Sequence, residues 1–277
     1  MNAPPAIADS SYRALSLARI GAMVLRYVYL LRSSLSRFAE IVYWPMVQVL
    51  LWGFLQLYLN QNSGFFARAG GIFIGAVLLW DVLVRGQLGF SVSFLEEMWS
   101  RNMANILMSP LRPAEFLASL MVMSLVRLVI GIVPVTIVAA VYFGFNLWGL
   151  GFAVAAFFAN LLLTSWAVGI VVSGLILRNG MGAENLAWTL MFVILPICAV
   201  YYPVATLPAF LQPVAWTLAP TYVFEGLRAL LLDQTFRADL MLQALALNVL
   251  YMAAAGLAFV RLLNDARRQG SLLQTGE

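Results

Sequence analysis

The sequence contains no histidine and no lysine, and it has a single cysteine, Cys198. The absence of histidine excludes imidazole acid–base catalysis and histidine metal ligands. One cysteine excludes an intramolecular disulfide and a metal site built from several cysteines. Without lysine there is no Gly-x-x-x-x-Gly-Lys-[Ser/Thr] loop to hold nucleotide phosphates. If the protein uses ATP and Mg²⁺, a partner is expected to bind them, and no cofactor is expected on this chain.

Charged residues are also scarce. They make up 10% of the 277 residues, whereas 63% are hydrophobic, and soluble domains carry about 25% charged residues. The mean hydropathy is +0.90. This composition predicts an integral membrane protein with little room for a soluble domain and no nucleic-acid partner.

Six hydrophobic runs are long enough for a membrane-spanning helix, which needs about 20 apolar residues. They cover residues 41–59, 72–92, 117–143, 147–177, 186–204 and 241–263. The stretch 205–240 is also apolar, but Pro208, Pro213 and Pro220 interrupt it. Because proline removes a backbone donor and disfavours helix in the residue before it, short helices that dip into the membrane and return are predicted there. The fold class predicted is an all-α membrane protein with six transmembrane helices and a re-entrant external hairpin.

The distribution of arginine indicates the orientation, since cytoplasmic loops carry an excess of positive charge. A cytoplasmic N-terminus leaves three arginines outside, namely Arg68, Arg228 and Arg237. The eleven placed inside are Arg13, Arg19, Arg26, Arg32, Arg37, Arg101, Arg112, Arg178, Arg261, Arg267 and Arg268. A membrane protein with both termini in the cytoplasm is therefore predicted.

Three regions of the chain are distinguished on this basis. Residues 1–11 contain no charged region followed by an apolar one, so they are predicted to be a disordered cytoplasmic tail and not a signal peptide. Residues 12–264 form one transmembrane domain, and residues 265–277 form a second cytoplasmic tail.

Residues 12–37 show a long helical pattern before the first span. Arg19, Arg26 and Arg37 fall within roughly 20° of one another on a helical wheel. This favours an amphipathic helix in the cytoplasmic interface, with its arginines toward lipid headgroups. A tilted start of the first span is the alternative.

The segment 93–113 is too polar to cross a bilayer and lies between two predicted spans. At helical spacing an apolar stripe forms on one side and polar residues fall opposite. The stripe consists of Phe94, Leu95, Met98, Trp99 and Ile106, and the polar side of Glu96, Glu97, Ser100, Arg101 and Asn105. A polar helix held at the membrane surface is a docking site for a soluble protein.

Three ionisable residues, Asp81, Arg85 and Arg127, lie inside predicted spans. Each costs roughly 2.5–3.5 kcal/mol on insertion scales, so such groups normally face protein or water. Asp81 and Arg85 are four residues apart and can pair on one helix face. The group either lines a substrate path or fixes helix packing. A secondary transporter that uses these three residues is the alternative function, although such proteins usually show repeated halves.

Two stretches together resemble a known family. The first reads Ile106-Leu-Met-Ser-Pro-Leu-Arg-Pro-Ala-Glu-Phe-Leu, and the second reads Pro220-Thr-Tyr-Val-Phe-Glu-Gly-Leu-Arg228. In order and spacing they resemble the permease subunits of ABC-2 type (type-2 ATP-binding-cassette) exporters. There, a similar turn follows the cytoplasmic coupling helix, and a similar element closes the external hairpin.

The resemblance implies that two copies of the chain pair and bind two copies of a separate ATPase. ATP-driven closure of the ATPases would act through the coupling helices and open a path outward. The first span opens Ala39-Glu-Ile-Val-Tyr-Trp-Pro, unlike the polysaccharide-exporting branch. A drug-like, lipid or glycolipid amphiphile is therefore the expected cargo, with membrane lipid as a further partner.

The resemblance also implies roles for individual residues. Tyr222, Glu225 and Arg228 would shape the external gate, or else brace the hairpin, because Glu225 and Arg228 are three residues apart and can pair. The residues expected to contact the ATPase are Glu96, Glu97, Trp99, Arg101 and Asn105.

Overall fold

The computed structural model describes residues 15–62 and 71–269. All secondary-structure elements within these ranges are helices, which confirms the predicted all-α class. The long ones are α2 (Leu35–Asn62), α4 (Ile72–Trp99), α6 (Pro113–Phe143), α7 (Phe152–Asn179) and α11 (Ala238–Gln269). The shorter ones are α1 (Leu17–Arg32), α5 (Met103–Met108), α8 (Leu186–Ile197), α9 (Gln212–Trp216) and α10 (Ala219–Leu232), with 3-10 turns η1 (Leu147–Leu150), η2 (Met181–Ala183) and η3 (Val204–Thr206).

The five long helices are apolar enough to cross a membrane. At about 1.5 Å per residue each exceeds the roughly 30 Å of a hydrocarbon core. The fifth predicted span, 186–204, is shorter than expected, because α8 ends at Ile197 after 12 residues. The chain then turns through Ala199, whose φ is 51°, toward Pro203. The prediction of six full spans is therefore not confirmed.

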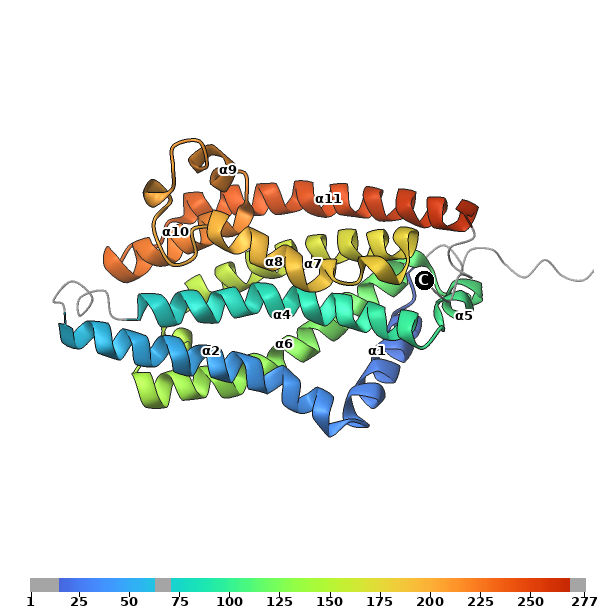
Figure 1. Cartoon of the computed structure of the whole chain (residues 1–277), viewed down its shortest axis with the longest axis horizontal. Coiled ribbons are helices and arrows are strands. Elements are labelled where there is room, and N and C mark those ends of the chain that lie inside the picture. Colours follow the sequence, from blue (N-terminus) through green and yellow to red (C-terminus); the bar gives the residue numbers. More distant parts are fainter. Residues whose placement is uncertain (1–14, 63–70, 270–277) are drawn as a thin grey trace, which may run out of the picture.

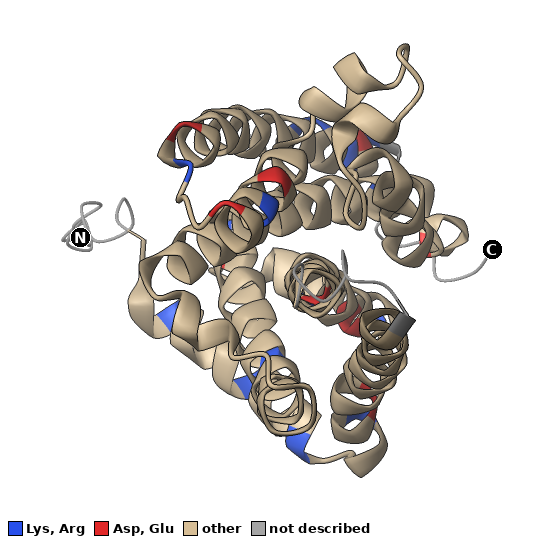
Figure 2. Ribbon diagram, turned by 90° about the vertical axis from the view of Figure 1, so that its left-hand side faces the viewer, with Lys and Arg blue, Asp and Glu red and all other residues tan. Residues whose placement is uncertain are grey.

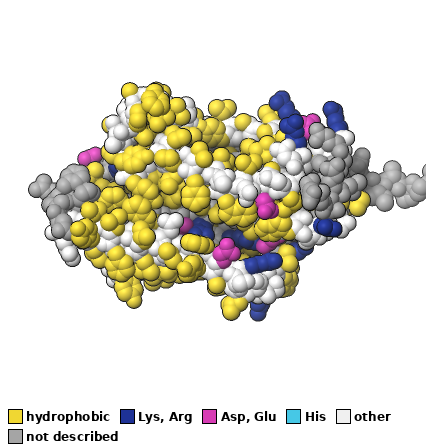
Figure 3. Space-filling view, viewed as in Figure 1, with side chains coloured by type: hydrophobic (Ala, Val, Ile, Leu, Met, Phe, Trp, Pro, Cys, Tyr) yellow, Lys and Arg dark blue, Asp and Glu magenta, His cyan; other side chains and the backbone are white. Residues whose placement is uncertain are grey.

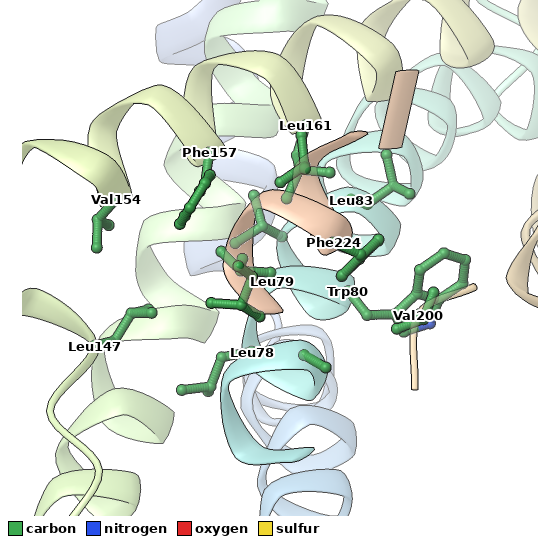
Figure 4. Packing of buried hydrophobic residues seen from close by; sticks show 14 of the residues in the cluster. Leu78, Leu79, Trp80, Leu83, Leu147, Val154, Phe157, Leu161, Val200 and Phe224 are labelled. Atoms are coloured by element: carbon green, nitrogen blue, oxygen red, sulfur yellow. The ribbon is translucent and has the colours of Figure 1, made fainter. Parts of the chain in front are cut away.

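The central helix of the bundle is α4. In its most apolar stretch 72% of the residues are buried, against 22% for α2 and 17% for α11. Leu78, Leu79 and Leu83 of α4 belong to the same buried cluster as Phe157 of α7 and Phe224 of α10 (Figure 4). A helix that is apolar on every side is expected in such an interior position.

Helices α4 and α7 approach closely where small residues meet. Ser165 of α7 donates a hydrogen bond from Oγ to the carbonyl of Leu83 at 2.8 Å. A Cβ at Gly169 would lie 2.8 Å from the ring of Phe90, and one at Gly86 would lie 2.8 Å from Oγ of Ser165. The small residues Ser165 and Gly169 therefore serve helix packing, as small-xxx-small rows do in membrane helices.

The two ends of the bundle carry different elements (Figure 1). α1, α5 and the C-terminal end of α11 lie at one end, whereas α9 and α10 lie toward the other. Viewed along the bundle, most of the ribbon is uncharged (Figure 2). The predicted tail at residues 1–11 and most of the predicted tail at residues 265–277 lie outside the described residues, and residues 265–269 belong to α11.

The predicted continuous helix over residues 12–37 is wrong. The chain breaks at Ser33 and Ser34, so Arg37 belongs to α2 and not to the same helix as Arg19 and Arg26. Oγ of Ser33 donates to the carbonyl of Leu30 at 2.8 Å. Such a side-chain bond to the backbone offers an alternative to helix continuation.

Short helices do form in the proline-rich stretch, as predicted. Pro213 lies in the first turn of α9, and Pro220 lies in the first turn of α10. In the first turn the missing N–H of proline has no intrahelical partner to lose, so proline starts a helix there without cost.

The close approach of α4 and α7 yields a prediction. Gly169→Ala should destabilise the protein by about 1–3 kcal/mol, because the added methyl group overlaps the ring of Phe90. Gly256→Ala is the matched control, since a Cβ there meets nothing within 4 Å. Thermal unfolding in one detergent compares the two variants. A Gly169 variant as stable as the control would contradict this account of the helix contact.

Candidate functional site

Two adjacent carboxylates lie at the C-terminal end of α4. The sequence predicted that Glu96 and Glu97 occupy an exposed polar face, but Glu96 is only 8% exposed and Glu97 is fully buried. This corrects their assignment to an accessible contact surface. Helical spacing alone could not reveal the burial, because the arginines that donate to these carboxylates come from other helices.

Arginines of three other helices neutralise the two carboxylates. Glu97 pairs with Arg26 of α1 and accepts a hydrogen bond from Nδ2 of Asn102 at 2.9 Å. Oε1 of Glu96 accepts from Nη2 of Arg127 on α6 at 2.9 Å, and Nη1 of Arg37 on α2 lies 3.5 Å away. A buried carboxylate needs such partners, since an unpaired buried charge is very costly.

A third buried carboxylate connects α1 to α6. Glu115 bonds Arg19 through both oxygens, at 2.6 and 2.9 Å, and also accepts backbone N–H groups of Ser16 and Arg112. Together with the pairs of Arg26 and Arg37, this contact corrects the expectation that the three arginines point to lipid headgroups. Their guanidinium groups face carboxylates of α4 and α6 instead.

Tyr27 of α1 is buried beside these pairs. The guanidinium carbon of Arg26 lies 6.0 Å from the centre of its ring. Burial raises the pKa of Tyr27, and the nearby carboxylate of Glu97 raises it further. The phenol therefore stays neutral, and its ring belongs to the buried cluster that includes Phe94 of α4 and Phe116 of α6.

Beyond Trp99 the chain turns sharply into α5. Arg101 has a φ of 55°, a left-handed conformation common just after a helix end. The backbone N–H of Asn102 bonds to the carbonyl of Glu97 at 2.9 Å. The predicted single amphipathic helix across residues 93–113 is therefore two helices with a break between them.

The remaining residues of the predicted contact set are exposed. Trp99 is 49% exposed and donates from Nε1 to Glu184 at 3.1 Å, and Arg101 and Asn105 lie on the turn and on α5. Met108, at the end of α5, is 78% exposed, and sequence reasoning missed it. Trp99, Arg101, Asn105 and Met108 are called the α5 patch below.

The predicted pair inside α4 forms. Nε of Arg85 donates to Oδ1 of Asp81 at 3.1 Å. Arg127 does not join this pair but bonds Glu96, so it connects α6 to α4. Asp81, Arg85 and Arg127 therefore belong to two separate ion-pair groups.

Arg85 and Arg127 nevertheless line the same cavity. It has a volume of about 210 Å³ and runs along α4 between Arg85 and Trp99, a span of about 21 Å at the helical rise. Figure 3 shows acidic and basic side chains gathered in the middle of an otherwise largely hydrophobic face. This cavity is called the charged groove below, and its ionisable lining residues are Arg37, Glu40, Arg85, Glu96 and Arg127.

A second cavity is apolar. It has a volume of about 340 Å³ and lies between α4, α7, α8 and α11. Leu83, Val168, Met191, Tyr251 and Ala255 are among its lining residues. Its walls contain no ionisable group other than the tyrosine.

The residues predicted for an external gate make contacts inside their own hairpin. Glu225 pairs with Arg228 at 2.9 Å and accepts the backbone N–H of Val204 at 2.8 Å. Arg228 donates to the carbonyl of Val200, and the hydroxyl of Tyr222 donates to the carbonyl of Trp216 at 2.9 Å. These bonds brace the hairpin, which is one of the two roles considered from the sequence.

The long apolar helices are those of an integral membrane protein. A family model for the ABC-2 type transporter matches residues 27–232. The chain therefore belongs to the ABC-2 type transporter family and is the membrane permease of an ABC transporter. No curated protein matches the chain.

The buried network yields a second prediction, by a double-mutant cycle on Arg26→Gln and Glu97→Gln. Each single variant should lower the free energy of unfolding, and the double variant should recover about 1 kcal/mol of the summed loss, because Arg26 is partly exposed. Unfolding in a denaturing detergent measures the free energy of each variant. The exposed pair Arg237 and Asp239 is the control and should show weaker interaction. Additive losses at Arg26 and Glu97 would contradict the pairing.

Proposed function

We propose that this chain is the permease subunit of an ATP-driven exporter in the bacterial inner membrane, with both termini in the cytoplasm. It moves an amphiphilic drug-like, lipid or glycolipid cargo outward. The family match over residues 27–232 is the observation that carries the proposal. Two copies of the chain assemble with two copies of a separate ATPase, which binds ATP and Mg²⁺, since the chain has no phosphate-binding lysine.

The α5 patch is the proposed docking surface for the ATPase. Its exposed apolar side chains, Trp99 and Met108, flank the polar groups of Arg101 and Asn105. Aromatic residues, methionine and arginine are enriched in protein interfaces. The patch also lies at the end of the bundle opposite the braced hairpin (Figure 1).

The ion pairs beneath the patch give a route for mechanical coupling. Glu97 lies two residues before Trp99 and is bonded to both Arg26 and Asn102. A displacement of the patch therefore acts on α1 through Glu97, and on α2 and α6 through Glu96. In this proposal Glu96 and Glu97 transmit force and do not themselves touch the ATPase.

The secondary-transporter alternative would need Asp81, Arg85 and Arg127 to act as one group. Arg85 bonds Asp81, whereas Arg127 bonds Glu96, so we favour the exporter. Glu225 and Arg228 brace the hairpin and do not add a further coupling group.

A third prediction tests the docking surface. The triple variant Trp99→Ala, Arg101→Ala and Asn105→Ala should weaken association with the co-expressed ABC ATPase at least tenfold, because it removes exposed interface groups and no buried pair. Co-purification and ATP hydrolysis by the complex measure the loss.

Phe210→Ala with Arg237→Ala is the matched control, because both residues are exposed near the hairpin end. The control should retain full association. If the triple variant still binds the ATPase at wild-type level and transports, the docking surface is elsewhere.

A further inference from the structure

The charged groove contains more hydrogen-bond donors than its protein acceptors use. Each guanidinium group carries five N–H donors. Among the described residues, Arg85 donates to protein through Nε, Arg127 through Nη2 and Arg37 through Nη1 at 3.5 Å. Nε of Arg127 is buried without a protein acceptor. Most donors of the three arginines are therefore left for a ligand or for solvent.

The carboxylates around the groove are engaged through one oxygen each. Oε1 of Glu96 accepts from Arg127 and Oδ1 of Asp81 accepts from Arg85, whereas Oε2 of Glu96 and Oδ2 of Asp81 are buried without a hydrogen-bond partner in the described part of the chain. Glu40 is the remaining acid of the lining and is exposed. The unused N–H donors of the three arginines therefore outnumber the unused carboxylate oxygens around the groove.

The rest of the lining is apolar or aromatic. Ile41, Leu88 and Val92 form apolar walls, and Trp99 and Trp188 complete them. Trp188 is 37% exposed. Such walls accept a hydrocarbon chain, while a buried arginine favours a phosphate or carboxylate, which it can bind through two parallel hydrogen bonds.

We propose that the charged groove binds the headgroup of an anionic amphiphile, a lipid-like molecule with a phosphate or carboxylate group. Arg85, Arg127 and Arg37 bind the anionic oxygens. The apolar walls contact the first part of the hydrocarbon chain. This inference rests on the proposed function, because it gives the class of cargo that the permease accepts at membrane depth.

The test measures lipid binding to the purified permease in neutral detergent, without ATPase or ATP. Lysophosphatidic acid and lysophosphatidylcholine of the same chain length are the probes, and native mass spectrometry gives the bound fractions. We expect the phosphomonoester to bind at least tenfold more tightly. Inorganic phosphate is added as a competitor and should not displace it at the same concentration.

Three variants test the residues. Arg37→Gln, and the double variant Asp81→Asn with Arg85→Gln, should each reduce the preference at least threefold; the double variant leaves no unpaired buried charge. Val92→Trp should reduce binding of both lipids because it narrows the groove and keeps every charge. Arg237→Gln, near the other end of the bundle, should keep the wild-type preference.

Equal binding of the two lipids, or an unchanged preference in both arginine variants, would overturn the proposal. Displacement by inorganic phosphate would reduce the site to an ion site and also overturn it. Loss of the permease dimer in Val92→Trp would assign the groove to the contact between copies. A permease that binds lysophosphatidic acid as expected but never associates with an ATPase would contradict only the proposed function.

Discussion

The burial of two adjacent carboxylates at the end of the central helix determines how the surrounding helices are placed. Glu96 and Glu97 need cationic partners, and these come from α1, α2 and α6. Buried ion pairs contribute little net stability compared with apolar packing of the same volume. Their effect is on geometry, because α1, α2 and α6 must each bring an arginine to the end of α4.

The same few residues connect the docking surface with the groove. Glu97 accepts a hydrogen bond from Asn102, the residue after Arg101 of the α5 patch, and Glu96 lines the charged groove. Since both belong to α4, a rigid helix at this depth, a shift of one carboxylate requires a shift of the other. In the proposed function this connection would couple the groove to the α5 patch.

The sequence predicted those features that depend on local spacing. Asp81 with Arg85 and Glu225 with Arg228 pair within one helical turn, so their separation in sequence is enough to place them together. The long apolar helices and the proline-started short helices follow from composition in the same way.

What the sequence could not predict depends on distant contacts. Arg26 and Glu97 are 71 residues apart, and Arg19 and Glu115 are 96 apart. A helical wheel treats polar residues as exposed and assumes an unbroken helix, and both assumptions fail at the end of α4. The sequence did contain one signal. The segment before the first predicted span has an excess of arginines, and carboxylates follow the second predicted span, so the two segments carry opposite charges.

The cost of charge at membrane depth bears on the groove itself. Arginine in a span costs roughly 2.5–3.5 kcal/mol on insertion scales, and only 10% of this chain is charged. Helix packing alone does not require arginine in a span, because apolar side chains of similar size pack at least as well. Helices α4 and α7 show this, since they meet through Gly86, Gly169 and Ser165 without any ion pair. The cost of these arginines is therefore better explained if they also bind the proposed anionic ligand than if they only pair with carboxylates.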